Sequence, residues 1–349
     1  MDRRILLVMV ILVGGALSAL LLPDLRPALP HRPSTNIRPV TTGSFTQPWC
    51  VDAYTTPEQW EAEFAAIEAA GIDLWIYQWT GDSARKTTIY PTKIPGWSQS
   101  SAYDQVESAL EAAQRHGVKV YLGLAFNEAW WQKEGSDRAW LLAEVRAMNA
   151  VADELYANYY LRYPETFAGW YINWEMDNVS GYNYRAAHKR NMIEALGAVS
   201  GHLKTLNPEL PSAIAPFFNA KIGVGSRRWQ YFWRDMLEQT DVDILMLQDG
   251  VGVDHATVEQ LPEWFQAVCD AAYAAGKQCW SDLENFTQTG PNSFIPAEPE
   301  RVAAQHQAVA PYVDRIVTFS FIAYMSPAWG IDPRYLEAYQ EYLRSVSPE

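Results

Sequence analysis

Short β-rich apolar runs alternate with longer segments of helical periodicity from about residue 41 onward. This alternation is typical of repeated βα units around a parallel sheet. Eight strands are predicted, over residues 43–51, 72–79, 118–126, 167–175, 212–219, 242–248, 278–284 and 315–324. Each is followed by a predicted helix, over residues 56–70, 103–116, 136–162, 184–206, 228–239, 256–275, 299–310 and 333–346.

The helix boundaries carry recognisable signals. Thr56-Pro57 is a typical helix start and Gly71 a typical stop, and Gly117 ends the next helix in the same way. Eight strands, each followed by a helix, predict an α/β fold of a single (β/α)₈ TIM barrel over residues 41–349. The alternative, a doubly wound open sheet, usually has a Gly-rich turn after its first strand, where this chain has Gln47-Pro48-Trp49.

The first 40 residues predict targeting rather than folded structure. Arg3 and Arg4 precede an uncharged apolar run over residues 5–22, which is typical of an export signal. The small pair Ala16 and Ser18 would permit cleavage, but the run is nearly long enough to span a membrane, so a cleaved signal peptide and an uncleaved anchor both fit. Residues 23–40, rich in Pro and Arg, predict a flexible linker. We therefore expect an exported protein that is periplasmic, extracellular or tethered to the membrane.

The cysteines and histidines do not predict a metal or cofactor site. Cys50, Cys269 and Cys279 allow one disulfide in an oxidising compartment and leave one thiol over. The six His fall in the linker, in helices or in loops, whereas metal-dependent barrel hydrolases need several at strand ends.

Charge and aromatic content favour a carbohydrate partner. The formal net charge of −14 argues against nucleic acid or an anionic lipid surface, and a neutral or cationic ligand fits better. The 15 Trp and 19 Tyr exceed what core packing needs, and flat aromatic rings suit the apolar faces of sugars. We expect a monomer.

Two predicted strands end in carboxylates that face the barrel interior. Side chains alternate with a period of two, so on the fourth strand Glu175 shares a face with Asn173, and on the seventh Glu284 shares one with Asp282. Catalytic residues of such barrels lie at the carboxyl ends of the strands, and strands four and seven lie across the barrel from one another.

Paired carboxylates suit glycoside hydrolysis, because one carboxyl protonates the leaving oxygen while the other acts as nucleophile or as base for water. We assign Glu175 as general acid/base and Glu284 as nucleophile, which predicts a retaining mechanism. Asp282 is the main rival for the second role, and Asp177 and Glu128 are weaker candidates.

Further residues near the predicted strand ends are candidates for substrate binding. Aromatic rings for stacking are Trp49, Trp79, Trp130, Trp131, Trp280, Tyr324 and Trp329, although the adjacent Trp130 and Trp131 are equally compatible with a satellite core beneath their loop. Polar candidates are Gln78, Asn127, Asn173, Asn219, Gln248 and Asp282.

The motifs Gly43-Ser44-Phe45-Thr46-Gln47-Pro48-Trp49, Gly71-Ile72-Asp73 and Tyr77-Gln78-Trp79-Thr80 resemble the opening of a bacterial domain-of-unknown-function family classed with TIM-barrel glycosidases. The resemblance covers most of residues 42–330 and implies a glycosidase-like barrel. The two glutamates also resemble the layout of the retaining glycosidase clan that includes cellulases and β-galactosidases. There the acid/base Glu directly follows an Asn, whereas here Trp174 stands between Asn173 and Glu175, which departs from that clan's pattern.

The sequence thus predicts an exported glycoside hydrolase acting on a polysaccharide or oligosaccharide. The alternative is a barrel that binds polysaccharide without cutting it, in an assembly at the cell surface. Variants in which Glu175 and Glu284 lose their carboxyl groups would separate the two.

Overall fold

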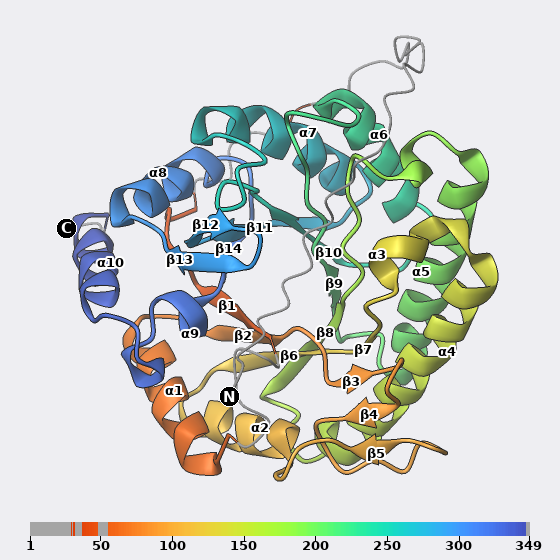
Figure 1. The fold of residues 1–349 in the computed structure, drawn as a ribbon, viewed down its shortest axis with the longest axis horizontal. Helices are drawn as coiled ribbons and strands as arrows, with labels where there is room; N and C mark the ends of the chain where they lie inside the picture. Colours follow the sequence, from red (N-terminus) through yellow and green to blue (C-terminus); the bar gives the residue numbers. More distant parts are fainter. Residues whose placement is uncertain (1–28, 30, 32–36, 48–54, 347–349) are drawn as a thin grey trace.

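A computed structural model describes residues 29, 31, 37–47 and 55–346, and its centre is a closed barrel of parallel strands (Figure 1). Around the barrel the order is β1-β14-β11-β10-β9-β8-β6-β2. The bounds are β1 Gly43–Thr46, β2 Leu74–Tyr77, β6 Lys119–Gly123, β8 Phe167–Ile172, β9 Ser212–Ile214, β10 Ile244–Gln248, β11 Gln278–Glu284 and β14 Arg315–Phe319. This closed ring confirms the predicted (β/α)₈ barrel.

Helices surround the barrel, one after each strand of the ring (Figure 1). The long ones are α1 Pro57–Ala69, α2 Gln105–Arg115, α4 Arg138–Leu155, α5 Ala186–Leu206, α6 Ser226–Leu237, α7 Leu261–Ala274, α8 Pro299–Val309 and α10 Arg334–Ser345. Shorter helical turns are α3 Trp130–Lys133, η1 Glu134–Ser136, η2 Tyr156–Tyr160, η3 Gly181–Asn183, η4 Val258–Gln260, α9 Phe321–Tyr324 and η5 Pro327–Trp329. The predicted strand over 315–324 therefore ends early, at Phe319, and its last residues form α9.

Helix α1 starts with the capping signals that the sequence predicts. The Thr56 side chain accepts a hydrogen bond from the Gln59 amide, and the Gln59 side chain accepts one from the Thr56 amide, which forms a capping box. Pro57 occupies the first helical turn, where its missing N–H costs nothing. After the helix Gly71 has a φ of +73°, a conformation that side chains with a Cβ adopt rarely.

The apolar residues form two layers separated by the strands. The inner layer fills the barrel and includes Phe45, Tyr171, Met246 and Trp280. The outer layer lies between the strands and the helices. On both β8 and β11 the alternation places one face in each layer. Tyr171 and Trp280 lie inside, while Ile172, Trp174, Cys279 and Leu283 lie outside. The predicted period-two alternation is thereby confirmed.

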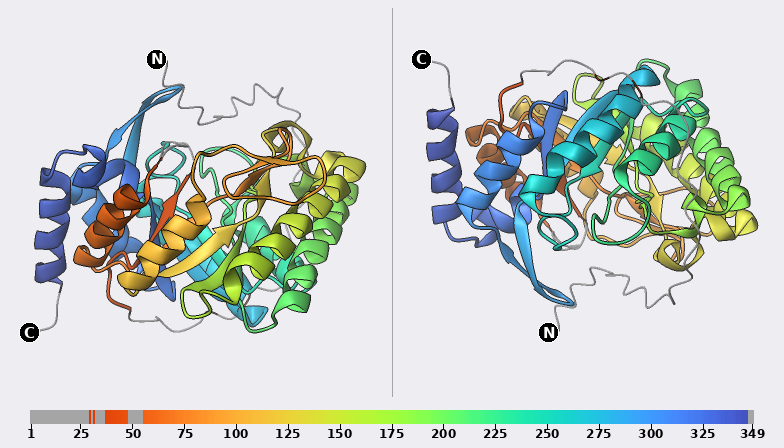
Figure 2. Two further views of the ribbon diagram at one scale, coloured as in Figure 1. Left: turned by 90° about the horizontal axis from the view of Figure 1, so that it is seen from below. Right: turned by 90° about the horizontal axis from the view of Figure 1, so that it is seen from above.

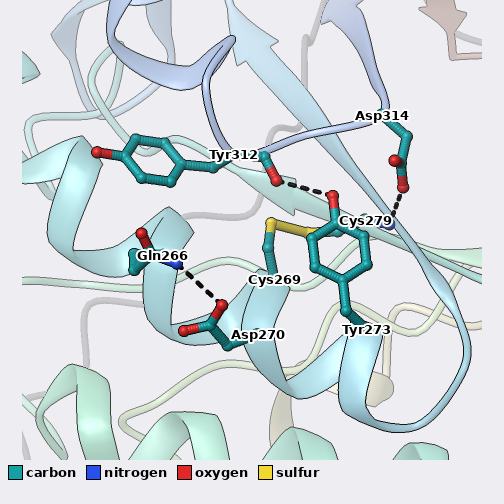
Figure 3. Close-up of a disulfide and its surroundings, with 7 residues drawn as sticks. All are labelled: Gln266, Cys269, Asp270, Tyr273, Cys279, Tyr312 and Asp314. Atoms are coloured by element: carbon teal, nitrogen blue, oxygen red, sulfur yellow. Dashed lines mark hydrogen bonds between the residues drawn. A yellow bond between two sulfur atoms is a disulfide. The ribbon is translucent and has the colours of Figure 1, made fainter. Parts of the chain in front are cut away.

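One disulfide joins Cys269 on α7 to Cys279 near the start of β11 (Figure 3). Both cysteines are buried in the outer layer. Beside the bridge, the Tyr273 hydroxyl donates a hydrogen bond to the Tyr312 carbonyl oxygen at 2.8 Å, and the Cys279 amide donates one to Asp314 Oδ2 at 3.1 Å (Figure 3). The bridge and these bonds attach the helix layer to the strand that ends at Glu284.

Two small sheets are added at the carboxyl ends of the barrel strands. One comprises β5 Ser98–Gln99, β4 Thr87–Thr88, β3 Gly81–Asp82 and β7 Ala125–Phe126. The other is the hairpin of β12 Phe286–Gly290 and β13 Ser293–Pro296, which follows β11 and projects beyond the barrel (Figure 2). At the base of the hairpin the Ala297 amide donates a hydrogen bond to the Asn285 carbonyl at 3.0 Å.

The predicted signal or anchor segment over residues 1–22, most of the predicted linker and residues 48–54, with Trp49 and Cys50, lie outside the described residues. Within the described part of the chain, no helix combines the length and apolarity that membrane crossing requires.

Candidate active site

Glu175 lies just after the carboxyl end of β8, half-buried at the mouth of the barrel, by which we mean the end where the barrel strands finish. Gln78, which directly follows β2, donates a hydrogen bond from Nε2 to Glu175 Oε1 at 2.8 Å. Burial of the carboxyl raises the pKa of Glu175 to about 7, against the opposing effects of hydrogen bonds from Gln248 and Gln78, and the negative charge of Glu128 raises it further. A carboxyl of this kind holds its proton close to neutral pH.

Glu284 ends β11 and is buried. Its Oε2 accepts a hydrogen bond from the Val253 amide at 3.0 Å, in the loop that follows β10. The same loop packs closely, because a Cβ built on Gly252 would lie 2.9 Å from Glu284 Oε2 and 2.5 Å from the Phe286 carbonyl oxygen. Glycine is therefore required where this loop meets the carboxylate.

Asp249 forms a buried acidic pair with Glu284. It follows β10, and its Oδ1 accepts hydrogen bonds from the Val251 amide at 3.1 Å and the Glu284 amide at 3.4 Å. Burial raises the pKa of both carboxyls, and the charge of Asp249 raises that of Glu284 further. Two neighbouring carboxyls titrate as a unit, so the pair tends to keep a proton at neutral pH.

Helix α8 supports this pair from outside the barrel. Gln305 is fully buried, and its Nε2 donates to Asp249 Oδ2 and to the Glu284 carbonyl oxygen, the latter at 3.2 Å. Arg301 lies one turn earlier on the same helix and donates from Nη2 to the Phe286 carbonyl oxygen. Its positive charge lowers the pKa of Asp249 and Glu284.

The sequence analysis assigned no role to Asp249, Arg301 or Gln305. Asp249 had a usable signal, since it directly follows a predicted strand. Arg301 and Gln305 had none, because helix periodicity does not show that a helix face reaches the ends of two strands.

The charges of both candidate catalytic carboxyls act on Asp282. Burial raises its pKa well above the ordinary value, and the charges of Glu284, Asp249 and Glu175 raise it further. The side chain is 3% exposed, and its Oδ1 has no hydrogen-bond partner among the described residues. On the neighbouring strand β10 its register partner is Gln248.

The remaining polar candidates divide into two groups. Gln78, Asn173 and Gln248 lie at or near the acidic residues, with Asn173 donating to the Leu124 carbonyl at 3.3 Å and Gln248 to the Ala215 carbonyl at 2.9 Å. Asn127 and Asn219 use their amide groups to hold loops in place, Asn127 in part through Glu144 on α4. Asn127 donates to Glu144 at 2.9 Å and accepts from the Ala129 amide, and Asn219 accepts from the amides of Lys221 and Ile222.

The two weaker carboxylate candidates also differ from Glu175 and Glu284 in their surroundings. Asp177 is buried and accepts hydrogen bonds from the amides of Val179 and Ser180 and from the Ser180 hydroxyl, all within one loop. Glu128 is exposed, and partial desolvation of its carboxyl by neighbouring groups, together with the charge of Asp82, raises its pKa.

The aromatic candidates occupy different depths. Trp130 is fully buried and stacks on Trp174 at 5.7 Å between ring centroids, as the satellite-core alternative predicts. Trp79, Trp131, Tyr324 and Trp329 keep partial exposure, with Trp79 stacked on Phe126 and Tyr324 against Phe286.

Trp280 is not near the rim, where we expected it. Its register partner is Arg315, the first residue of β14, whose guanidinium lies 5.3 Å from the indole centroid, and its Nε1 donates to Gln278 at the start of β11. It lies four residues before Glu284, and four residues of strand span about 13 Å, so the indole belongs to the opposite end of the barrel.

Among the described residues no group of three or more His, Cys, Asp or Glu is arranged to hold a metal ion.

Comparisons with solved structures give several fold neighbours that are named as glycosidases. A solved structure from Bacteroides thetaiotaomicron, described provisionally as an alpha-L-fucosidase, is 23% identical, covers 93% of this chain and 99% of its own, and has a TM-score of 0.73. The endo-1,4-beta-mannanase of Rhizomucor miehei is 10% identical with a TM-score of 0.59, covering 92% of this chain and 98% of its own. The endo-1,4-beta-D-mannanase of Thermotoga petrophila is 13% identical with a TM-score of 0.56, covering 80% and 88%. These likenesses show that the chain shares the barrel fold of these proteins.

Sequence comparison adds a relative and a family. The uncharacterized protein YbcH of Escherichia coli K12 is 26% identical over 235 residues, which cover 65% of this chain and 71% of that protein. The family described as a domain of unknown function, DUF4434, matches residues 41–329. This chain belongs to the DUF4434 family.

Proposed function

We propose that the protein is a glycoside hydrolase that cleaves a polysaccharide or oligosaccharide with Glu175 and Glu284. The observation that carries the proposal is the position of the two carboxyls. Each lies at or just beyond the carboxyl end of a barrel strand, on the inward face, and burial raises the pKa of each. Active sites of barrel enzymes lie at this end, and perturbed carboxyls gather at catalytic sites. The shared glycosidase-like fold supports the same reading.

In this proposal Glu175 is the general acid/base. A pKa of about 7 keeps it protonated when the glycosidic oxygen must leave and lets it act as base in the second step. The hydrogen bond from Gln78 holds the carboxyl in place. The residue as a whole keeps partial exposure.

Glu284 is the proposed nucleophile. The Val253 amide hydrogen bonds to its carboxylate and favours the ionised form, as does the charge of Arg301. The negative charge of Asp249 opposes ionisation, so activity should require loss of the proton that the Asp249–Glu284 pair retains. A carboxylate attacking the anomeric carbon gives a covalent intermediate and net retention of configuration.

Export belongs to the same proposal. The disulfide between Cys269 and Cys279 suits an oxidising compartment, and the apolar run near the start of the chain is typical of an export signal.

The test is hydrolysis by the purified protein of a panel of bacterial exopolysaccharides and plant glycans, followed by variants on the best substrate. Glu175→Gln and Glu284→Gln should each lower kcat/KM by at least about 10²-fold, the lower range for one acid/base or nucleophile. Glu63→Gln is the matched control, since Glu63 is another buried glutamate with a raised pKa but it lies on α1, bonded to Ser326.

Full activity in both site variants would overturn the assignment. Binding of a glycan that is never cut would favour the non-catalytic alternative. The anomeric configuration of the first product, followed by proton NMR, distinguishes a retaining from an inverting reaction.

A further inference from the structure

Three buried oxygen atoms near the candidate carboxylates accept no hydrogen bond from any described residue. They are Gln78 Oε1, Asn173 Oδ1 and Asp282 Oδ1, on side chains that are 4%, 1% and 3% exposed. The amide nitrogens of Gln78 and Asn173 are used, by Glu175 and the Leu124 carbonyl, which fixes the orientation of both amides. Buried polar atoms are nearly always paired, so this group of acceptors calls for a ligand that donates hydrogen bonds.

The same region holds more carboxyl groups than the reaction uses. Glycoside hydrolysis needs two, and Asp282 stands as a third within electrostatic reach of both Glu175 and Glu284. It is on the inward face of β11, one step deeper than Glu284. Within the described part of the chain, neither Asp282 nor Glu175 forms an ion pair.

The nearby positive charge, on Arg301, acts on Asp249 and Glu284 rather than on Asp282. Arg301 approaches from α8, donates to the Phe286 carbonyl and the Thr287 hydroxyl, and acts on Asp249 and Glu284. A substrate carrying carboxylate or sulfate at this position would add like charge to a buried acidic group, which is unfavourable. A cationic group would supply a counter-charge, which would favour the ionised form of Asp282 despite its raised pKa.

We propose that the sugar held between Glu175 and Glu284 carries a free, protonated amino group bound by Asp282, so that the substrate is a glycan containing hexosamine residues without N-acetyl groups. This inference rests on the proposed hydrolase function. An ammonium group offers three donors and no acceptor, which matches a set of unpaired acceptors. An N-acetyl group instead offers a single uncharged N–H donor and brings a carbonyl oxygen, which would face these acceptors without a partner.

Binding of monosaccharides tests the inference without knowledge of the linkage. Glucosamine, galactosamine and mannosamine are titrated into the purified protein at neutral pH by NMR, beside their parent hexoses and their N-acetyl forms. At least one hexosamine should bind about tenfold tighter than its parent hexose and its N-acetyl form, as one charge-assisted hydrogen bond can provide. Asp282→Asn should remove that margin.

Asp241→Asn is the matched control, because it makes the same chemical change at an exposed site just before β10, at the other end of the barrel. It should leave the margin intact. Equal or tighter binding of the parent or N-acetyl sugars, absence of hexosamine binding in all three configurations, or a margin that survives in Asp282→Asn would each overturn the inference.

A hydrolysis experiment tests this inference separately from the proposed hydrolase function. Glycans with and without N-acetyl groups are offered to the same preparation. Cleavage confined to neutral or N-acetylated glycans would refute the amino-sugar assignment and leave the hydrolase proposal standing. Selective hexosamine binding that needs Asp282, without cleavage of any glycan, would support the recognition step and refute the hydrolase proposal.

Discussion

Reduction of the Cys269–Cys279 bridge should lower the thermal stability of the barrel by a calculable amount. The two cysteines are separated by 10 residues, and the entropy of closing a loop of that length corresponds to about 3 kcal/mol at 25 °C. The unfolding entropy is about 2.1 cal/mol/K per residue, or roughly 600 cal/mol/K for a domain of the length that the family match covers. Dividing one by the other gives a fall in Tm of about 5 °C.

The measurement is thermal unfolding followed by circular dichroism, on protein refolded after reduction and held in reductant, against protein kept oxidised. A variant with Cys269→Ala and Cys279→Ala should show the same Tm with and without reductant, and Cys50→Ser should retain the wild-type difference. An unchanged Tm after complete reduction would refute the loop-entropy reasoning. A reductant-induced fall in Tm of the same size in the double variant would also refute it, because that variant has no disulfide between residues 269 and 279.

Three further outcomes follow from the buried groups and close contacts. Burial raises the pKa of Glu63 from 4.5 to about 7, so the unfolded chain ionises first as pH rises and the free energy of unfolding falls by about 3 kcal/mol across that interval. Glu63→Gln should remove this fall, measured by urea unfolding at pH 5 and pH 8. An unchanged pH dependence would contradict the prediction. Asp249→Asn removes a charge that raises the pKa of Glu284, so the acid limb of the kcat/KM profile should shift to lower pH; a limb that stays in place argues against Glu284 as the ionised nucleophile. Gly252→Ala would put a Cβ 2.5 Å from a carbonyl oxygen and 2.9 Å from the Glu284 carboxylate, so kcat/KM should fall by about 10²-fold, whereas Gly197→Ala, with its nearest contact at 3.6 Å, should leave kcat/KM unchanged.

The barrel was predictable because its signals are local and repeated. Apolar runs, glycines after helices and the Thr56-Pro57 start all depend on a few neighbouring residues, and the period-two alternation assigned the faces of β8 and β11 correctly. Depth within the barrel was harder. Trp280 shares a face with Glu284, yet it lies four residues earlier on β11, beside Arg315 at the opposite end of the barrel.

Side chains that build loops look the same in sequence as side chains that could bind sugars. Asn127 and Asn219 follow strands, as a ligand-binding amide would, but both are committed to nearby backbone and side-chain partners. Gln305 shows the reverse case. Its position in the middle of a helix carried no signal, although the packing of α8 brings its amide to Asp249 and to the backbone of Glu284.

The hairpin of β12 and β13 is closed at its base by the bond between Ala297 and Asn285, before the chain enters α8. Residues added or removed between Gly290 and Ser293 would therefore leave the anchor points of β11 and α8 where they are. This makes the hairpin tip a place where the chain tolerates insertion, and where relatives or engineered versions can acquire a new recognition segment while the acidic pair beneath it keeps its geometry.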